Sequence, residues 1–434
     1  MIQEILYWYD SWIFDPGYSK DNRLLPMWAS KRKALQDYTD TQFIVLFIPF
    51  AISFAIAMDI IIPIIPTLRV IFKTDQASMQ LTLSSFMIVL GFGQLLWGPL
   101  SDHFGRRTII IWSAIFYLLG AILCLFAFSV QQLIIYRIIQ ALGSCGLIVS
   151  SFAIVRDLYS GMKSAKFYGY LNGVIAVSPL TAPFIGAFIY LYLGWRAVFG
   201  FLTLFAIYTL IVTVFFLENT LPDERRQPLQ KLFNFMTILQ IIKNPIFFSY
   251  VMQVSLASAC LFTFFSSSPY YFINILKVPL AYYGFFLCYN SIIFSIGCFI
   301  ASRFVFKFGI CGTALIGCCS LLLCGVLVFI FNYTLGFELI SFLLSLSFLG
   351  FGTALMISAA TGGALQPFEH MAGTASSVLG VFQHGVSGII GTLILLWPIQ
   401  NAVPLSILML VSALMCIGLL LLNRKKLCEI TVKS

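Results

Sequence analysis

Asp59 has the most specific chemistry in this sequence, because it lies within a long apolar segment, AIAMDIIIPIIP (55–66). An ionised carboxylate deep in a bilayer costs at least about 2.5 kcal/mol on insertion scales. Burial favours its protonated form and a nearby cation favours its ionised form, so such a group can take up and release a proton. We predict that Asp59 couples proton movement or binds a substrate cation; a permanent salt bridge between helices is the alternative. Pro63 and Pro66 follow on the same segment, where each removes a backbone hydrogen bond and favours a kink or a helix end.

Arg137 is the one Lys or Arg well inside an apolar segment, RIIQALGSCG (137–146). Gln140 and Gly143 follow at i+3 and i+6, so the three residues share one face of a helix. A cation at this position can hold the carboxylate of Asp59 or of a substrate. We predict a coupling or gating role for Arg137, with a fixed structural pair as the alternative.

The segment GPLSDHFGRR (98–107) places glycines and charges between two apolar segments. Glycine allows close backbone approach and unusual dihedral angles. We expect Asp102 to accept hydrogen bonds from the N-terminus of the next helix and from Arg106. The segment SRFVFKFG (302–309) has the same spacing without an acid, so any network should be asymmetric. The residues expected in this network are Gly98, Asp102, Gly105, Arg106, Arg107, Arg156 and Asp157. A gate that opens and closes is the predicted role, and a topology anchor is the alternative.

Two further groups of residues have patterns that suit transport. In SPLTAPFIGA (178–187), two prolines and a glycine predict a bent helix that allows close packing, and a simple packing kink would account for them equally well. The residues of interest there are Ser178, Pro179, Pro183 and Gly186. Aromatic residues with polar tips in FTFFSSSPYYF (262–272) suit the binding of amphipathic molecules. The candidates for a substrate cavity are Met58, Gln140, Phe264, Tyr270, Tyr289 and Asn290.

The composition determines the class of protein that must position these residues. Of 434 residues, 60% are hydrophobic and 9% are charged, whereas a soluble domain has about 25% charged residues. Apolar runs of about 20 residues suit membrane-spanning helices rather than barrel strands. The net charge is +9, but the basic residues lie between the apolar segments, so we expect no nucleic-acid binding. No metal-ligand spacing, catalytic triad or phosphate loop is present in the sequence, so we expect no enzyme, no metal and no cofactor.

The expected fold is an all-α membrane protein with twelve spans in two six-helix bundles. The expected spans are 42–66, 77–100, 108–128, 131–155, 166–191, 195–217, 245–272, 280–303, 309–331, 336–361, 371–396 and 400–422. They define bundles over 42–217 and 245–422, a polar linker over 218–244, an N-terminal extension over 1–41 and a tail over 423–434. For the extension we expect a partly disordered tail whose aromatic residues rest at the lipid headgroups; a regulatory or partner-binding segment and a translation start at Met27 are the alternatives. If the N-terminus is cytoplasmic, twenty of the 25 Lys and Arg residues lie on the cytoplasmic side and four on the other. The sequence therefore predicts cytoplasmic termini.

The motifs together resemble the drug:proton antiporters of the major facilitator superfamily, most closely the bicyclomycin-resistance (Bcr/CflA) type, over about 43–422. The matching segments are D-x-x-x-P-x-x-P at 59–66, G-x-x-x-D-x-x-G-R-[KR] at 98–107, ENTLPDERRQP at 218–228 and HMAGTASS at 370–377. The resemblance implies the major facilitator fold, Asp59 as the proton-coupling carboxylate, and Arg137 as the motif arginine of the fourth helix. It also implies an inner-gate relay through Asp102 and Arg106.

The sequence departs from this family pattern in two places. The antiporter motif usually reads G-x-x-x-G-P-x-x-G-G, whereas Ser178, Ala182 and Ala187 replace three of its glycines here, around Pro179 and Pro183. Ala51 and its neighbours are neutral where some multidrug relatives have a second acid, so Asp59 is expected to be the one proton carrier of the first helix.

These observations predict a monomeric inner-membrane transporter that exports small amphipathic compounds in exchange for protons. Its partners would be the substrate, protons and the lipid bilayer. Two alternatives remain from the sequence: a proton-coupled importer or metabolite carrier on the same fold, and a membrane sensor that does not transport.

Overall fold

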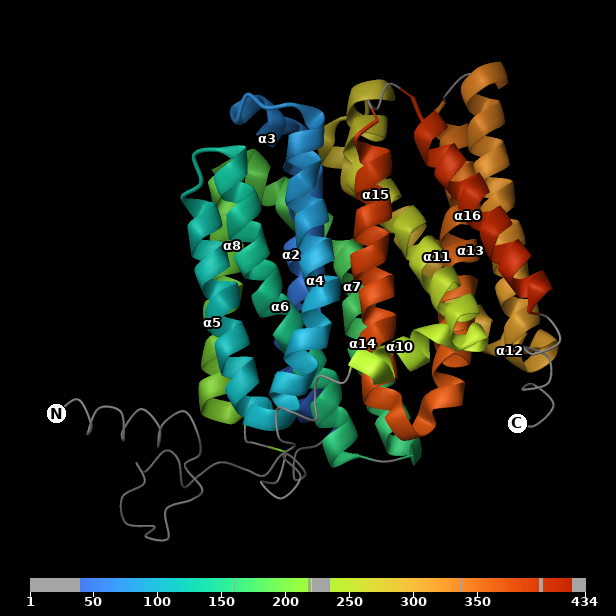
Figure 1. The fold of residues 1–434 in the computed structure, drawn as a ribbon. Helices are drawn as coiled ribbons and strands as arrows, with labels where there is room; N and C mark the ends of the chain where they lie inside the picture. The colour runs from blue at the N-terminus through green and yellow to red at the C-terminus, as the bar shows by residue number, and fades with distance from the viewer. Residues whose placement is uncertain are drawn as a thin grey trace, which may run out of the picture.

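The computed structural model describes residues 40–159, 161–217, 220, 235–335, 338–397 and 401–423. Within these ranges the chain forms helices and no strand. Eleven of the described helical segments are long and apolar enough to cross a membrane. Figure 1 shows most of these helices side by side, running along a common direction. The prediction of an all-α membrane protein is therefore confirmed.

The first half of the chain forms a group of helices with locally encoded starts. Asp75 caps one of them, with its Oδ1 accepting from the Ser78 amide at 2.8 Å, and the Ser129 hydroxyl accepts from the Gln132 amide at 3.3 Å at the start of another. Such side chains satisfy amides that have no partner within the helix. The elements are α2 (Asp40–Asp59), η3 (Ile62–Ile64), α3 (Ile65–Ile71), α4 (Gln76–Phe104), α5 (Arg106–Leu125), α6 (Val130–Leu158), α7 (Gly161–Leu193) and α8 (Trp195–Phe216).

The second half begins with a short helix that the sequence analysis assigned to the polar linker. Residues 235–243 of that linker form α10, while 218–219 and 221–234 lie outside the described residues. The predicted extension over 1–41 and the tail after 423 also fall almost entirely outside them. The elements are α10 (Phe235–Lys243), α11 (Pro245–Pro269), η5 (Tyr270–Ile275), α12 (Leu280–Ile330), η6 (Phe331–Leu335), α13 (Leu339–Leu365), η7 (Gln366–Met371), α14 (Ala372–Gly380), η8 (Val381–Val386), α15 (Ser387–Leu395) and α16 (Val403–Leu422).

The longest helix, α12, contains 51 residues and reverses direction at Gly309. At 1.5 Å per residue a straight helix of this length would measure about 76 Å, more than twice the roughly 30 Å hydrocarbon core. Gly309 has φ 70° and ψ 174°, in a region that favours glycine. The break falls at the predicted boundary between the spans 280–303 and 309–331.

The first membrane segment is interrupted directly after Asp59. α2 ends at this residue, Ile60 and Ile61 form a turn, and the chain continues through η3 into α3. Pro63 and Pro66 each lie in the first turn of the element that follows, where a residue without an amide N–H is tolerated. The prolines thus accompany the interruption that the sequence predicted.

The two halves touch along α4, which packs against α14, η8 and α15. The backbones approach closely at Gly91, where an added Cβ would overlap the backbone of Gly385. A Cβ on Gly388 would lie 3.1 Å from the Met87 Cβ. A second contact joins α7 to α12, where the Cys288 thiol donates to the Leu180 carbonyl at 2.9 Å. Small residues therefore allow the halves to meet at backbone distance.

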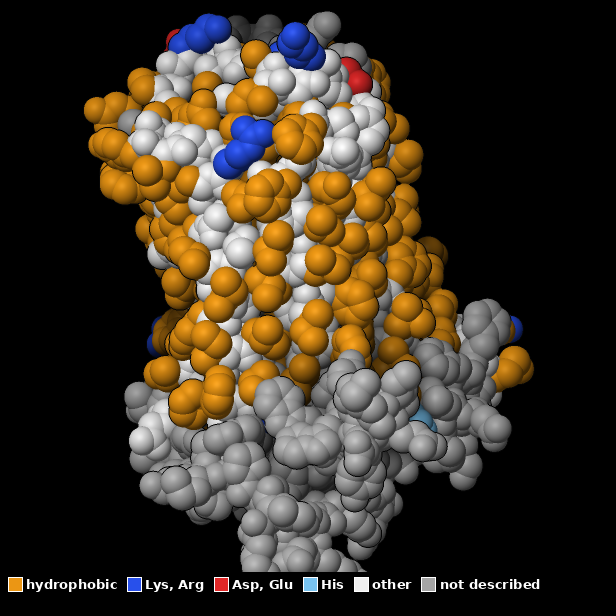
Figure 2. Space-filling model, turned by 90° about the vertical axis from the view of Figure 1, so that its left-hand side faces the viewer, with side chains coloured by type: hydrophobic (Ala, Val, Ile, Leu, Met, Phe, Trp, Pro, Cys, Tyr) orange, Lys and Arg blue, Asp and Glu red, His pale blue; other side chains and the backbone are white. Residues whose placement is uncertain are grey.

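The outer surface of the bundle is apolar, as a lipid-facing surface requires. Figure 2 shows one side covered mostly by hydrophobic side chains, with charged side chains mainly near its ends. Large apolar residues of α8 contribute to the exposed surface, including Leu204 at 68% and Ile211 at 47% exposure.

Candidate functional site: a buried carboxylate and a charged cluster

Asp59 lies at the end of α2 with 8% of its surface exposed. The Ser178 hydroxyl, on α7, donates a 2.8 Å hydrogen bond to Asp59 Oδ2. This partner is neutral, and no ion pair to Asp59 occurs among the residues described. The permanent salt bridge considered as an alternative is therefore not formed with any of the described residues. A buried carboxylate without a counter-charge suits a group that changes its protonation state.

Arg137 is fully buried in α6, and backbone and neutral side-chain groups surround it. Its Nη1 donates to the Ala57 carbonyl at 2.9 Å and to Gln140 Oε1 at 2.6 Å. Its guanidinium lies 4.1 Å from the centre of the Phe86 ring, a cation–π contact with α4. Arg137 thus joins three helices of the first half.

The predicted contact between Arg137 and the Asp59 carboxylate is not formed. Two acceptors, Gln140 Oε1 and the Ala57 carbonyl, occupy Nη1, and the Phe86 ring covers the guanidinium. Arg137 instead reaches the backbone two residues before Asp59. Its Nε and Nη2 make no hydrogen bond with the described residues.

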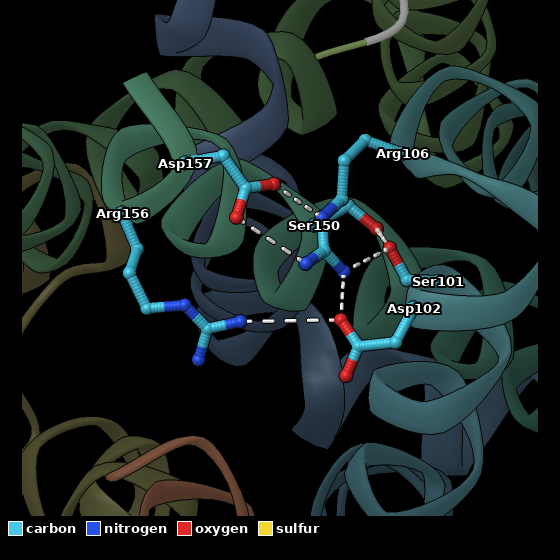
Figure 3. Close-up of polar contacts among 6 residues, drawn as sticks. All are labelled: Ser101, Asp102, Arg106, Ser150, Arg156 and Asp157. Atoms are coloured by element: carbon cyan, nitrogen blue, oxygen red, sulfur yellow. Dashed lines mark hydrogen bonds and ion pairs between the residues drawn. The ribbon is translucent and has the colours of Figure 1, made fainter. Parts of the chain in front are cut away.

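A charged cluster lies at the end of α4, at the start of α5 and at the end of α6 (Figure 3). Arg106, only 2% exposed, is its centre. Its Nη1 lies 2.6 Å from Asp102 Oδ1, and its Nε lies 2.7 Å from Asp157 Oδ2. Nη1 also donates to the Ser101 hydroxyl at 3.1 Å, which is 3.2 Å from the Ser150 hydroxyl. The carboxylates and the guanidinium thus hold three helices together.

Arg156 contributes a weaker contact to the same cluster. Its Nη2 is 3.9 Å from Asp102 Oδ1, and its side chain is 45% exposed (Figure 3). Exposed ion pairs of this kind contribute about 0–1 kcal/mol to the stability of the folded protein. Of the five charged residues that the sequence analysis grouped, all except Arg107 meet in this cluster, and their role as a gate stays a prediction.

Four details of the turn differ from the expectation or extend it. Asp102 lies inside α4 and does not cap α5, because no side chain caps the start of that helix. Gly105 alone makes the turn, with φ 89° and ψ 150°. Arg107 Nη2 donates to the Val214 carbonyl at 3.2 Å and so joins α5 to α8. Gly98 faces the second half, because an added Cβ would lie 3.3 Å from the Ser377 hydroxyl.

The corresponding segment of the second half holds no ion pair among the described residues. Arg303 lies 5.4 Å from the centre of the Phe299 ring, and Lys307 lies 5.3 Å from that of Phe308. Both cations thus lie against aromatic rings, as expected for a segment without an acid.

The antiporter-motif residues of α7 lie against the first membrane segment. Pro179 and Pro183 lie within α7, and Ser178 contacts Asp59. At Gly186 the approach to the turn after Asp59 is so close that a Cβ would overlap the Ile60 carbonyl oxygen. The motif thus packs directly on the interruption that follows Asp59.

The cavity candidates occupy different environments. Met58 is 7% exposed beside Asp59, and Gln140 is bonded to Arg137. The ring of Tyr270 lies under Arg69, whose guanidinium is 5.9 Å from the ring centre. These three residues lie at or near contacts within the first half or between the halves, and a role in substrate binding stays a prediction for each.

The other three cavity candidates have contacts within the second half. Phe264 is fully buried, 6.4 Å from the Phe342 ring centre. Asn290 Nδ2 donates to the Leu346 carbonyl at 3.0 Å. Tyr289 is 38% exposed and its hydroxyl is 2.7 Å from that of Ser347. Packing between α12 and α13 accounts for the last two contacts.

A reciprocal contact between the halves was missed by the sequence analysis. Gln80 Nε2 donates to the Ser266 carbonyl at 2.9 Å, and the Ser266 hydroxyl donates to Gln80 Oε1. Both residues are 1% exposed. Gln80 precedes Asp102 by 22 residues on α4, about 33 Å along the helix, so this contact lies toward the opposite end. A glutamine three residues after the predicted helix start at 77 was the available signal.

The geometry can be compared with known proteins. The family description "Major Facilitator Superfamily" matches residues 47–392. A chloramphenicol resistance protein from Pseudomonas aeruginosa is 30% identical, covering 90% of this chain and 92% of its own. A bicyclomycin resistance protein homolog from Haemophilus influenzae is 30% identical, and the match covers 75% of this chain and 82% of the length of the homolog. The solved structure of a D-xylose–proton symporter has a TM-score of 0.65 at 15% identity, covering 86% of this chain and 96% of its own.

The family match covers most of the chain, and the structural likeness supports the same fold. The relatives named for drug resistance confirm the resemblance drawn from the motifs. This chain therefore belongs to the major facilitator superfamily, and it is a multi-pass membrane transporter rather than an enzyme.

Proposed function

We propose that this protein exports small amphipathic compounds in exchange for protons, and that Asp59 carries the proton. The observation that supports this most is a buried carboxylate at a helix interruption, with a neutral hydroxyl as its partner and no ion pair among the described residues. Interrupted helices near the middle of the membrane are typical of the binding sites of alternating-access carriers. Relatives named for chloramphenicol and bicyclomycin resistance support drug-like substrates.

The proposed topology has twelve spans, because the reversal at Gly309 divides α12 into two passes. Both termini are cytoplasmic, the membrane is the bacterial inner membrane, and the transporter acts as a monomer. The distribution of Lys and Arg supports this orientation. The proton gradient is the energy source, and no cofactor takes part.

The proposed cycle alternates between states open at opposite ends. The contact between Gln80 and Ser266 closes the outer end, and the Arg106 cluster belongs to the inner gate. A proton from outside neutralises Asp59 and releases the substrate, and loss of the proton inside restores the charged site. One charge crossing 100 mV supplies about 2.3 kcal/mol, and one pH unit adds about 1.4 kcal/mol. The first supports roughly a fiftyfold gradient of substrate and the second roughly a tenfold one, since about 1.4 kcal/mol corresponds to a factor of ten.

Transport assays in proteoliposomes test the function directly. Purified protein is reconstituted with a pH-sensitive dye inside, and a panel that includes chloramphenicol and bicyclomycin is added on one side. Exchange requires protons to move opposite to the substrate, so the dye must respond with the sign of an antiporter. Co-movement of protons and substrate would identify an importer instead, and binding without movement of either would identify a sensor.

The inner gate predicts unequal effects of neutral substitutions in the two halves. Asp102→Asn removes the charge that binds Arg106 at 2.6 Å and should slow exchange roughly tenfold, since a hydrogen bond to a charged group contributes about 1.5–3 kcal/mol. Arg303→Gln is the matched control, because Arg303 lies against a ring and pairs with no acid among the described residues. We expect its exchange rate to change less than about threefold. Equal slowing of both variants, measured in proteoliposomes, would contradict an asymmetric gate.

A further inference from the structure

The hydroxyl of Ser178 forms a hydrogen bond with Asp59, although a buried serine in a helix can satisfy its hydroxyl within that helix. Serine hydroxyls inside helices commonly donate to a carbonyl of the preceding turn. Ser345 on α13 does so, with its hydroxyl 2.9 Å from the Ser341 carbonyl. Ser178 is equally buried, yet its hydroxyl leaves its own helix and donates to Asp59 Oδ2 at 2.8 Å.

The backbone around Ser178 keeps this hydroxyl in place. Gly186, about two turns further along α7, lets that helix approach the Ile60 carbonyl more closely than any side chain would permit. Pro179 and Pro183, which lie between Ser178 and Gly186, fix the backbone dihedral φ at their own positions. The position of Ser178 relative to Asp59 is thus set by contacts on both sides of the interruption in the first membrane segment.

The other charged and titratable groups around α2 have their own partners. Arg137, from α6, bonds the Ala57 carbonyl and Gln140. Tyr117, from α5, has its hydroxyl 3.3 Å from the Ser53 carbonyl.

Two more groups approach from the second half. Tyr283, from α12, lies within electrostatic reach of Asp59 but shares its hydroxyl hydrogen bond with Ser268 at 2.6 Å. His384, from η8, lies against the Phe54 ring at 5.7 Å. Among the described residues, Ser178 is therefore the one side chain that donates a hydrogen bond to the Asp59 carboxylate.

We propose that Ser178 is a positioning residue that holds the Asp59 carboxylate against α7 and sets the pH range over which it exchanges its proton. This inference rests on the proposed function of Asp59. A hydroxyl that donates to a carboxylate stabilises the ionised form more than the protonated form.

The test compares pH profiles of four single variants. Ser178→Ala and Ser178→Gly remove the donor and should move the pH of half-maximal exchange upward by about one unit, because the proton is held more tightly. Ser178→Thr keeps a hydroxyl and should restore the wild-type profile. Ser345→Ala removes an equally buried hydroxyl that bonds only its own helix and should leave the profile unchanged.

A second readout does not depend on transport. Infrared spectra of the purified protein are recorded across the pH range, and the carboxyl band that disappears in Asp59→Asn is assigned to Asp59. In Ser178→Ala this band should titrate at higher pH than in the wild type. Coinciding titrations, or an equal shift in Ser345→Ala, would overturn the role of Ser178. If the infrared shift occurs and no compound drives proton movement, the proposed function fails while the positioning role stands.

Discussion

Asp59→Asn is expected to abolish uphill transport while leaving the protein folded. Asparagine has nearly the same shape and can still accept the Ser178 hydrogen bond, so the packing of α2 on α7 should persist. It cannot bind and release a proton, so substrate movement loses its link to the gradient. Accumulation ratios in proteoliposomes should fall to one, and the substrate-induced signal of the internal pH dye should vanish.

Asp75→Asn is the matched control for this substitution. Asp75 is exposed at the start of α4, and hydrogen bonds from Ser78 hold the pKa of its carboxyl below its usual value. It therefore stays ionised at working pH and exchanges no proton during transport. Asparagine is as good a helix cap as aspartate, so this variant should accumulate substrate normally. Wild-type accumulation by Asp59→Asn would remove Asp59 from the coupling mechanism.

Arg106→Gln is expected to cause the largest loss of stability among the charged residues. Arg106 is 2% exposed and binds Asp102 and Asp157 at 2.6 and 2.7 Å. Removing one partner of a buried ion pair costs about 3–5 kcal/mol, because the other charges remain without compensation. Unfolding of the purified protein in detergent, followed by thermal shift or denaturant, should show a clear drop in midpoint.

Arg156→Gln removes the neighbouring cation and serves as the comparison. Arg156 is 45% exposed and 3.9 Å from Asp102, so its loss should cost no more than about 1 kcal/mol. Arg106→Lys keeps the positive charge but lacks the planar guanidinium that contacts two carboxylates at once. Its loss of stability should lie between those of Arg106→Gln and Arg156→Gln. If Arg106→Gln and Arg156→Gln destabilise the protein equally, burial does not determine the strength of this cluster.

The features of this fold that are encoded locally could be predicted from the sequence. Apolar runs located the membrane helices to within several residues, and Gly309 marks the reversal between two predicted spans. The contact of Asp102 with Arg106 followed from their i, i+4 spacing across the helix end. The approach of Asp157 was expected because the predicted fourth span ends on the same side of the membrane as the turn at 98–107.

The contacts between distant segments could not be predicted from residue types alone. Charge suggested a pair of Asp59 and Arg137, but Gln140, three residues along the same helix, supplies a nearer acceptor. The hydrogen-bond partner of Asp59 is Ser178, which the sequence analysis noted only as the replacement of a motif glycine. The bonds between Gln80 and Ser266 join residues 186 apart and leave no periodic signal.

The contact of Gly91 with Gly385 has a consequence for the speed of the transport cycle. At this point the backbones of the two halves approach so closely that a Cβ on Gly91 would overlap Gly385. Interlocking side chains must change rotamer before two surfaces can slide, and each such change adds a barrier. The pair of glycines adds no such barrier at its own position, so the resistance to tilting comes from the side chains around it, such as Phe92 beside Gly385, and from the polar contacts at the two ends.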